Sequence, residues 1–339
     1  MWSGIWEGAL ADALEAIPEG VEPDAQKSLT LYGWRDKGSY ILTGATKRQY
    51  HLSCAADEFG GVITRDVEHL MDQSLQHRVL LHEAFVAKRT ASATWSLVTL
   101  YYLAVYLGLA WLRLTGKAIT YIGSDEIERL RKLGTGVISK SEKSPGNGTY
   151  VIRCMEMDGA RRVLILDRLK HNNFHEAFWA TLFKDFKDRL TENLDQTAGT
   201  ETRLFSCLAA QDIAKGTMWP SRLRNLANYR VGFAYDGFLS ADGFQFIEAW
   251  PSTGFSSVID IISAAENESM KMASPSVDKM PSAYARFLVY YTALLGNAVE
   301  ELRAEIWRQR NISTRWQKSR EKNLEAWCGK PSKMPWTFG

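Results

Sequence analysis

The chain has 339 residues, of which 45% are hydrophobic and 24% charged, and these proportions exclude a disordered chain and fit a globular protein. Lys and Arg total 41 against 39 for Asp and Glu, so the formal net charge of +2 gives no argument for a polyanionic partner of the whole protein. The four cysteines form no CxxC pair, which argues against a zinc site or a disulfide framework and predicts a cytoplasmic protein.

The length exceeds that of a usual domain, so we expect two structural units, or one unit with a large insertion. For residues 1–62 we expect a small α+β portion. An amphipathic helix that ends at Pro18 and Gly20 is followed there by β-forming residues mixed with Gly and Thr. Residues 63–339 predict a helical domain. It begins with a long amphipathic helix from Thr64 to Lys88, where apolar residues recur at helical intervals.

The next segment is long and apolar enough to raise the question of a membrane span. Residues 91–112 contain no charged side chain, and roughly 20 apolar residues can cross a bilayer. However, the run includes Tyr101, Tyr102 and Tyr106, whose hydroxyl groups would lack partners in the middle of a membrane. We therefore expect a buried core helix and no membrane span, with a single-span protein as the alternative.

Beyond this helix, the sequence predicts a β-hairpin inserted in the helical domain at about residues 149–167. Its strands flank Asp158 and Gly159, a pair typical of a type I′ turn. Further helices are expected over residues 173–190, 203–214 and 283–310, and from Pro220 onward. The expected fold class is mainly α, with a helical core, an inserted β-hairpin and a small N-terminal α+β portion.

Two histidines are candidate metal ligands. His171 and His175 are four residues apart, so on a helix they would share one face, as pairs of metal ligands do. The helix is expected to begin between them, and no partner carboxylate stands where a metalloprotease motif would have one. We predict no metal site and no cofactor.

The C-terminal residues 301–339 carry more Lys and Arg than Glu, with tryptophans interleaved. Cations combined with stacking rings suit single-stranded nucleic acid, and Lys318 and Arg320 are candidate nucleic-acid-binding residues. The alternative is that the tryptophans anchor this segment to the protein body while the cations stay solvated.

A second candidate segment, residues 221–236, concentrates arginine, asparagine and tyrosine. Guanidinium groups bind phosphate through paired N–H groups, and amide and phenol groups can hold a sugar or a base edge. These side chains predict an RNA-binding helix with the candidate residues Arg222, Arg224, Asn225, Tyr229 and Arg230. The alternative is structural, with the arginines paired to acidic neighbours and the amides linking helices.

Two pieces of the sequence resemble the HEPN superfamily, the higher-eukaryote and prokaryote nucleotide-binding domains. The stretch WSLVTLYYLAVYLGLAWLRLTGK resembles the tyrosine-rich central helix of these proteins, and RNLANYR is similar to their Arg-Asn-x-x-x-His motif. Active members are metal-independent ribonucleases that pair two motif helices across a dimer. The resemblance thus implies that Arg224 contacts phosphate and Asn225 orients a ribose or the arginine, while Tyr229 replaces the motif histidine and donates a hydrogen bond.

The resemblance implies a HEPN-like component of a prokaryotic antiviral defence or toxin system that binds or cleaves RNA without metal, as a homodimer or with a protein partner. Whether it cleaves stays open, because a tyrosine with an ordinary pKa near 10 is a poor base at neutral pH. The alternative is a non-enzymatic helical scaffold, a subunit whose aromatic surface docks on a partner protein.

Overall fold

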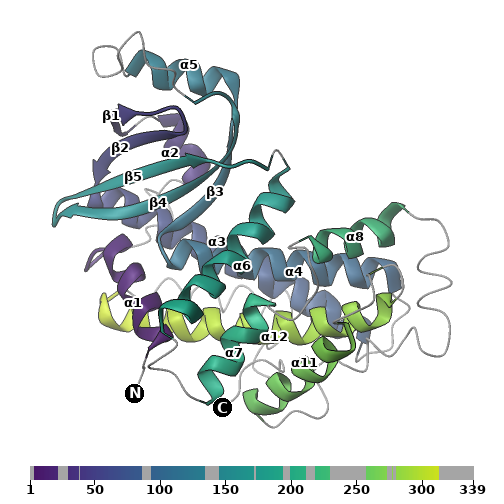
Figure 1. The fold of residues 1–339 in the computed structure, drawn as a ribbon. Coiled ribbons are helices and arrows are strands. Elements are labelled where there is room, and N and C mark those ends of the chain that lie inside the picture. Colours follow the sequence, from purple (N-terminus) through teal and green to yellow (C-terminus); the bar gives the residue numbers. More distant parts are fainter. Residues whose placement is uncertain are drawn as a thin grey trace.

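A computed structural model describes eleven stretches of the chain, drawn in Figure 1. They are residues 4–21, 30–37, 39–85, 93–133, 145–171, 173–193, 199–210, 218–229, 257–272, 277 and 280–312. Across these stretches, helices predominate and a single antiparallel sheet of five strands accompanies them, which confirms the mainly α prediction.

Within the described stretches, helices and strands are interspersed up to Arg168, and only helices follow. The helices are α1 (Ile5–Ala16), α2 (Leu31–Lys37), α3 (Ala56–Phe85), α4 (Ala93–Leu114), α5 (Ser124–Leu133), α6 (Phe174–Glu192), α7 (Thr200–Ala209), α8 (Trp219–Tyr229), α11 (Val258–Met272) and α12 (Pro281–Gln309). The strands are β1 (Ile41–Ala45), β2 (Gln49–Ala55), β3 (Lys117–Ile122), β4 (Gly148–Asp158) and β5 (Arg161–Arg168).

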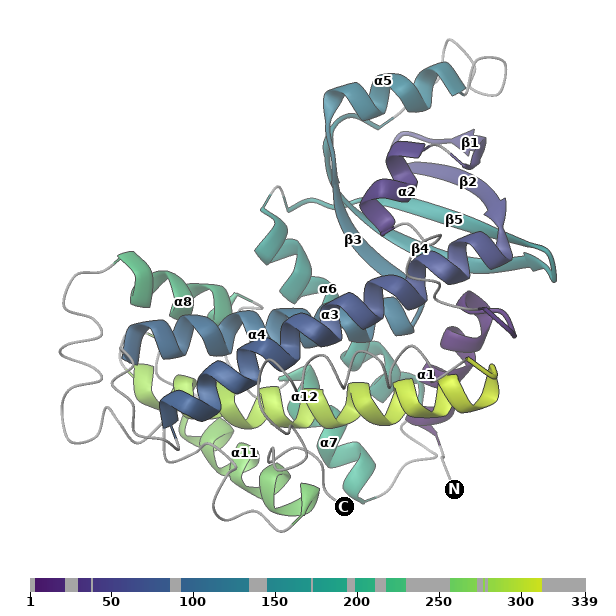
Figure 2. The same cartoon turned by 180° about the vertical axis from the view of Figure 1, so that it is seen from behind.

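Helix α4 is the centre of the helical body. Figures 1 and 2 show α3 and α12 running beside it, while α6 crosses it and α8 lies along its N-terminal half. The helix meets the length and apolarity criteria for a membrane span, and 78% of that stretch is buried inside the protein. Its apolar surface is covered by other helices, as in a protein core.

Helices α4 and α6 approach closely at Gly108. A β-carbon at this glycine would lie 2.6 Å from Cζ of Phe178 and 2.7 Å from Cδ2 of Leu182, so any larger residue would push the helices apart. Helix α6 matches the helix expected over residues 173–190 and ends two residues beyond it, and Phe178, Leu182, Phe186 and Leu190 are all buried. These residues recur every four positions, so they lie on the face of α6 that packs on the core.

The sheet has the strand order β1-β2-β5-β4-β3, so the predicted hairpin of β4 and β5 forms its middle. Strand β5 pairs with β2, and β4 pairs with β3. The sheet thus combines strands from both sides of the boundary predicted at residues 62–63, and that boundary lies within α3. The hairpin is part of this larger sheet rather than a separate insertion in the helices.

The turn of the hairpin differs from the predicted type I′ turn. Gly159 and Ala160 form the two-residue loop between Asp158 and Arg161, and neither loop residue has the positive φ that a type I′ turn requires. Instead, the Asp158 carboxylate accepts hydrogen bonds from the backbone N–H groups of Ala160 at 2.9 Å and Arg161 at 2.8 Å. The side chain of Asp158 thus stabilises a different turn.

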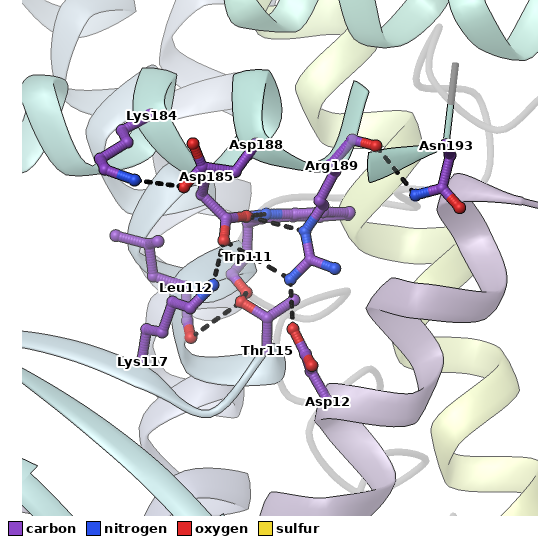
Figure 3. Close-up of polar contacts among 10 residues, drawn as sticks. All are labelled: Asp12, Trp111, Leu112, Thr115, Lys117, Lys184, Asp185, Asp188, Arg189 and Asn193. Carbon is purple, nitrogen blue, oxygen red and sulfur yellow. Dashed lines mark hydrogen bonds and ion pairs between the residues drawn. The ribbon is translucent and has the colours of Figure 1, made fainter. Parts of the chain in front are cut away.

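One buried carboxylate joins the helical body to the sheet (Figure 3). Asp185 of α6, whose side chain is 2% exposed, accepts a hydrogen bond of 2.8 Å from Nε1 of Trp111 on α4. It also pairs with Nε of Arg189 at 3.0 Å and with Lys117 of β3. Arg189 in turn pairs with Asp12 of α1 at 2.6 Å. Four elements therefore meet around Asp185.

The charges around Asp185 decide its protonation state. Burial raises the pKa of Asp185, but the positive charges of Arg189 and Lys117 outweigh burial and hold that pKa well below its ordinary value of 3.8. Ionised Asp185 therefore stabilises the folded protein. Because its pKa is lower in the folded state, this stabilisation is fully present above the pKa of the unfolded state, and it is lost as the pH falls through the lower pKa of the folded state.

We predict that Asp185→Ala lowers the free energy of unfolding by about 3–5 kcal/mol, because it leaves two cations without their buried counter-charge. Chemical denaturation followed by circular dichroism measures this change. Asp188→Ala is the matched control on the same helix, since Asp188 is half exposed and pairs with Lys184, and we expect a loss below about 0.5 kcal/mol. Equal losses in the two variants would contradict the structural role of Asp185.

Candidate functional site

The side chain of Tyr101 connects helices α4, α6 and α8. Its buried hydroxyl accepts a hydrogen bond from Nε1 of Trp179 at 3.1 Å and lies 3.0 Å from Nδ1 of His175 and 3.2 Å from Oγ of Ser221. The Arg224 guanidinium lies over the same ring, 5.4 Å from its centre, in a cation–π arrangement. We call these five residues the Tyr101 cluster.

Two hydrogen bonds fix how far α6 is shifted along α4. The hydrogen bond between Tyr101 and His175 and the one between Trp111 and Asp185 both join residues 74 apart in the chain. The two contacts therefore follow each other in the same order on both helices, and the close approach at Gly108 lies between them. The buried ion pairs of Asp185 thereby fix where His175 stands against Tyr101.

His175 is a half-buried imidazole whose environment disfavours its charged form. Burial and the neighbouring positive charge of Arg224 both lower the pKa of His175 from 6.5, so the ring is neutral at pH 7. The Tyr101 hydroxyl can donate to Nδ1 or accept from it, and it is therefore compatible with either neutral tautomer. A neutral histidine with such a partner is suited to proton transfer near neutral pH.

Tyr101 itself stays a protonated phenol. Burial raises its pKa above 10.0, although hydrogen bonds with Ser221 and Trp179 and the charge of Arg224 act in the opposite direction. Tyr101 is therefore suited to orient His175 through its hydroxyl and to stack against the Arg224 guanidinium, and it is not suited to act as a base.

A surface pocket of about 440 Å³ lies beside the cluster, and we call it the α8 pocket. Ser221 belongs to both, because it lines the pocket and lies within hydrogen-bond distance of Tyr101. The residues lining the pocket are Glu176, Met218, Ser221, Arg222, Asn225, Leu226 and Tyr229. The pocket thus has an arginine, an amide and a phenol on one wall and a glutamate on another.

The structure separates the predicted site residues into two groups. Arg222, Asn225 and Tyr229 follow each other at intervals of three and four residues and line the α8 pocket together, while Arg224 packs on Tyr101. The side chain of Tyr229 is 76% exposed. Three further candidates lie outside the described residues, namely Arg230, Lys318 and Arg320.

The position of His175 was not predicted. His171, the other candidate metal ligand, has its Nδ1 3.7 Å from Oε2 of Glu176, whereas His175 contacts Tyr101. No group of three or more His, Cys, Asp or Glu side chains that could hold a metal occurs in the described part of the chain. All four partners of Tyr101 are at least 74 residues away in sequence, so no local spacing could have revealed the cluster.

Comparisons with protein-family models, with curated proteins and with solved structures find no match for this chain. The resemblance to the HEPN superfamily therefore rests on the two sequence pieces alone. The function has to be inferred from the geometry and chemistry of the site.

We predict that Arg224→Gln raises the pKa of His175 towards 6.5, because the substitution removes a positive charge that disfavours the imidazolium ion. A pH titration of the histidine ring signals by NMR measures the shift. Arg222→Gln, a change of the same chemistry on the same helix, is the control and should leave the His175 pKa in place. If neither variant moves this pKa, Arg224 does not act on His175 electrostatically.

Proposed function

We propose that the Tyr101 cluster and the α8 pocket bind the phosphodiester backbone of RNA and cleave it without a metal, in a HEPN-like component of a prokaryotic defence or toxin system. The observation that carries the proposal is the shared contact of Arg224 and His175 with Tyr101. A guanidinium that can hold a phosphate and an imidazole that can exchange a proton therefore lie together beside a pocket.

The contacts of Arg224 differ from those of the structural arginines. Among the described residues, other buried or half-buried arginines form ion pairs with carboxylates, while buried Arg162 donates to backbone carbonyl oxygens. Four of these pairs are Arg35 with Glu126, Arg113 with Asp66, Arg189 with Asp185 and Arg303 with Glu68. Arg224 lies over a tyrosine ring and next to a histidine whose pKa it lowers. For an arginine in this position, the anion of a bound ligand would supply a charged hydrogen-bond partner, and this supports a phosphate site.

In the proposal, His175 takes the place of the histidine that the resemblance to the HEPN motif leads one to expect. The motif has a histidine where Tyr229 stands, and a phenol is a poorer base than an imidazole. In the proposal, His175 of α6 supplies the imidazole, and Tyr229 is a hydrogen-bond donor and a stacking surface in the pocket.

The proposed reaction is an internal transfer at phosphorus. Arg224 holds the scissile phosphate, and neutral His175 accepts the proton of the ribose 2′-hydroxyl as its oxygen bonds to phosphorus. The bond from phosphorus to the 5′ oxygen breaks, and that oxygen takes up a proton from water. The products are a 2′,3′-cyclic phosphate and a 5′-hydroxyl end, and His175 returns its proton to solvent.

A second candidate function, a helical subunit that docks on a partner protein, is favoured by exposed aromatic side chains. Tyr229 on α8 is 76% exposed and Trp95 on α4 is 67% exposed, and large exposed rings are typical of protein interfaces. A homodimer through α8 would be one form of such an interface and would also pair two RNA sites.

The proposal predicts cleavage of labelled single-stranded RNA by the purified protein in the presence of EDTA, with a cyclic phosphate product. His175→Ala should slow cleavage by about 100-fold or more, the usual contribution of a general base, while RNA is still retained. Arg224→Gln should reduce both retention and cleavage, because it removes the phosphate contact. Tyr229→Phe should have a small effect on the rate.

Arg308→Gln is the matched control, since Arg308 lies on the exposed surface of α12 and pairs with Glu305. It should behave like the wild type. If the wild type binds RNA but does not cleave it, the proposed catalytic step is wrong and the protein only binds RNA. The absence of both would overturn the RNA proposal and leave the docking subunit as the better account.

A further inference from the structure

A row of half-buried aromatic rings leads from His175 along α4 to α3. The ring of Tyr102 lies 6.2 Å from that of His175, Tyr106 lies 6.4 Å from Tyr102, and His77 of α3 lies 5.1 Å from Tyr106, all measured between ring centres. Each of the four rings is partly exposed to solvent. We call His175, Tyr102, Tyr106 and His77 the aromatic ladder.

Helical geometry accounts for the ladder. Trp95, Tyr102 and Tyr106 are spaced by seven and four residues, so they lie on one face of α4, while the neighbouring Tyr101, Leu103 and Val105 are buried. Trp95 is 67% exposed and extends the aromatic face by two helical turns. The ladder is therefore a solvent-facing stripe of a helix that is otherwise part of the core.

The two histidines at the ends of the ladder are held by polar contacts. Nδ1 of His77 lies 2.8 Å from the carbonyl oxygen of Gln73, within hydrogen-bond distance, and Nδ1 of His175 lies 3.0 Å from the Tyr101 hydroxyl. Ordered rings lose little conformational entropy when a ligand stacks on them, so such a surface is prepared for flat ligands.

We propose that the aromatic ladder binds consecutive unpaired bases of single-stranded RNA whose phosphate lies at Arg224. The inference rests on the proposed function and adds the surface that would hold the bases of a single strand several nucleotides long. Every base has a flat face that can stack on a tyrosine or histidine ring, so binding tolerates any sequence. Duplex RNA hides those faces, because its bases are stacked and paired.

The ladder and the arginine contribute to binding in different ways. Phenol rings carry no charge at neutral pH, so stacking on Tyr102 and Tyr106 releases no counterions. Contacts to phosphate do release counterions and weaken as the salt concentration rises. Removal of the Tyr102 or Tyr106 ring should therefore lower affinity without changing its salt dependence, whereas Arg224→Gln should reduce the salt dependence.

The test measures binding of 2′-O-methyl RNA, which lacks the nucleophilic hydroxyl and is not cleaved. A fluorescent dodecamer is followed by anisotropy, and a dinucleotide and the duplex dodecamer are used as competitors. Tyr106→Ala should weaken dodecamer binding about tenfold, within the range for loss of one stacked base, and leave dinucleotide binding unchanged. Tyr106→Phe, which keeps the ring, should bind within about twofold of the wild type.

Tyr106→Leu fills the same space without a ring and replaces the alanine variant if the latter fails to fold. Suppose that Tyr106→Leu and His77→Ala bind the dodecamer as well as the wild type does, while Arg224→Gln loses binding. This result would overturn the proposal that the aromatic ladder binds bases and would leave the proposed function standing. Equal affinity for duplex and single strand would also overturn it. If the wild type binds neither the dodecamer nor the dinucleotide, the proposed function fails together with the ladder.

Discussion

The ion pairs of Asp185 are the constraint on which the site depends. A carboxylate in the interior is costly unless its charge is compensated, and here Arg189 and Lys117 compensate it while Trp111 donates a hydrogen bond. These partners come from α6, β3 and α4, so they fix the position of α6 along α4. Because His175 stands ten residues before Asp185 on α6, as Tyr101 stands before Trp111 on α4, the same register brings His175 to Tyr101.

The Tyr101 cluster places a guanidinium and an imidazole against the same tyrosine side chain. Arg224 lies close enough to His175 to lower its pKa, and a cation beside a basic ring is not the arrangement that a purely structural ion pair would have. Burial and Arg224 keep the imidazole neutral, and the Tyr101 hydroxyl orients it. A neutral base, a guanidinium and a pocket next to each other are the components of acid–base chemistry on a phosphate ester.

Local patterns in the sequence predicted local structure well. The stripe of apolar residues on α6, the apolar run of α4 and the hairpin of β4 and β5 all follow from periodicity or composition over short distances. The prediction of a type I′ turn was wrong because the side chain of Asp158 stabilises another turn. The two residues Asp158 and Gly159 alone do not reveal this contact. The Asp185 ion pairs and the contact of Tyr101 with His175 depend on the register of two helices 74 residues apart in the chain, and single-sequence patterns contain no information about such a register.

The central claim is that RNA binds between α6 and α8, with its phosphate at Arg224. Photo-cross-linking of thiouridine-containing single-stranded RNA, followed by mass spectrometry of the modified peptides, tests this claim most directly. The account predicts cross-links at Tyr102, His175 or Tyr229, and it predicts their loss in Arg224→Gln while Arg308→Gln keeps them. Cross-links confined to the β-sheet, or unchanged by Arg224→Gln, would contradict it.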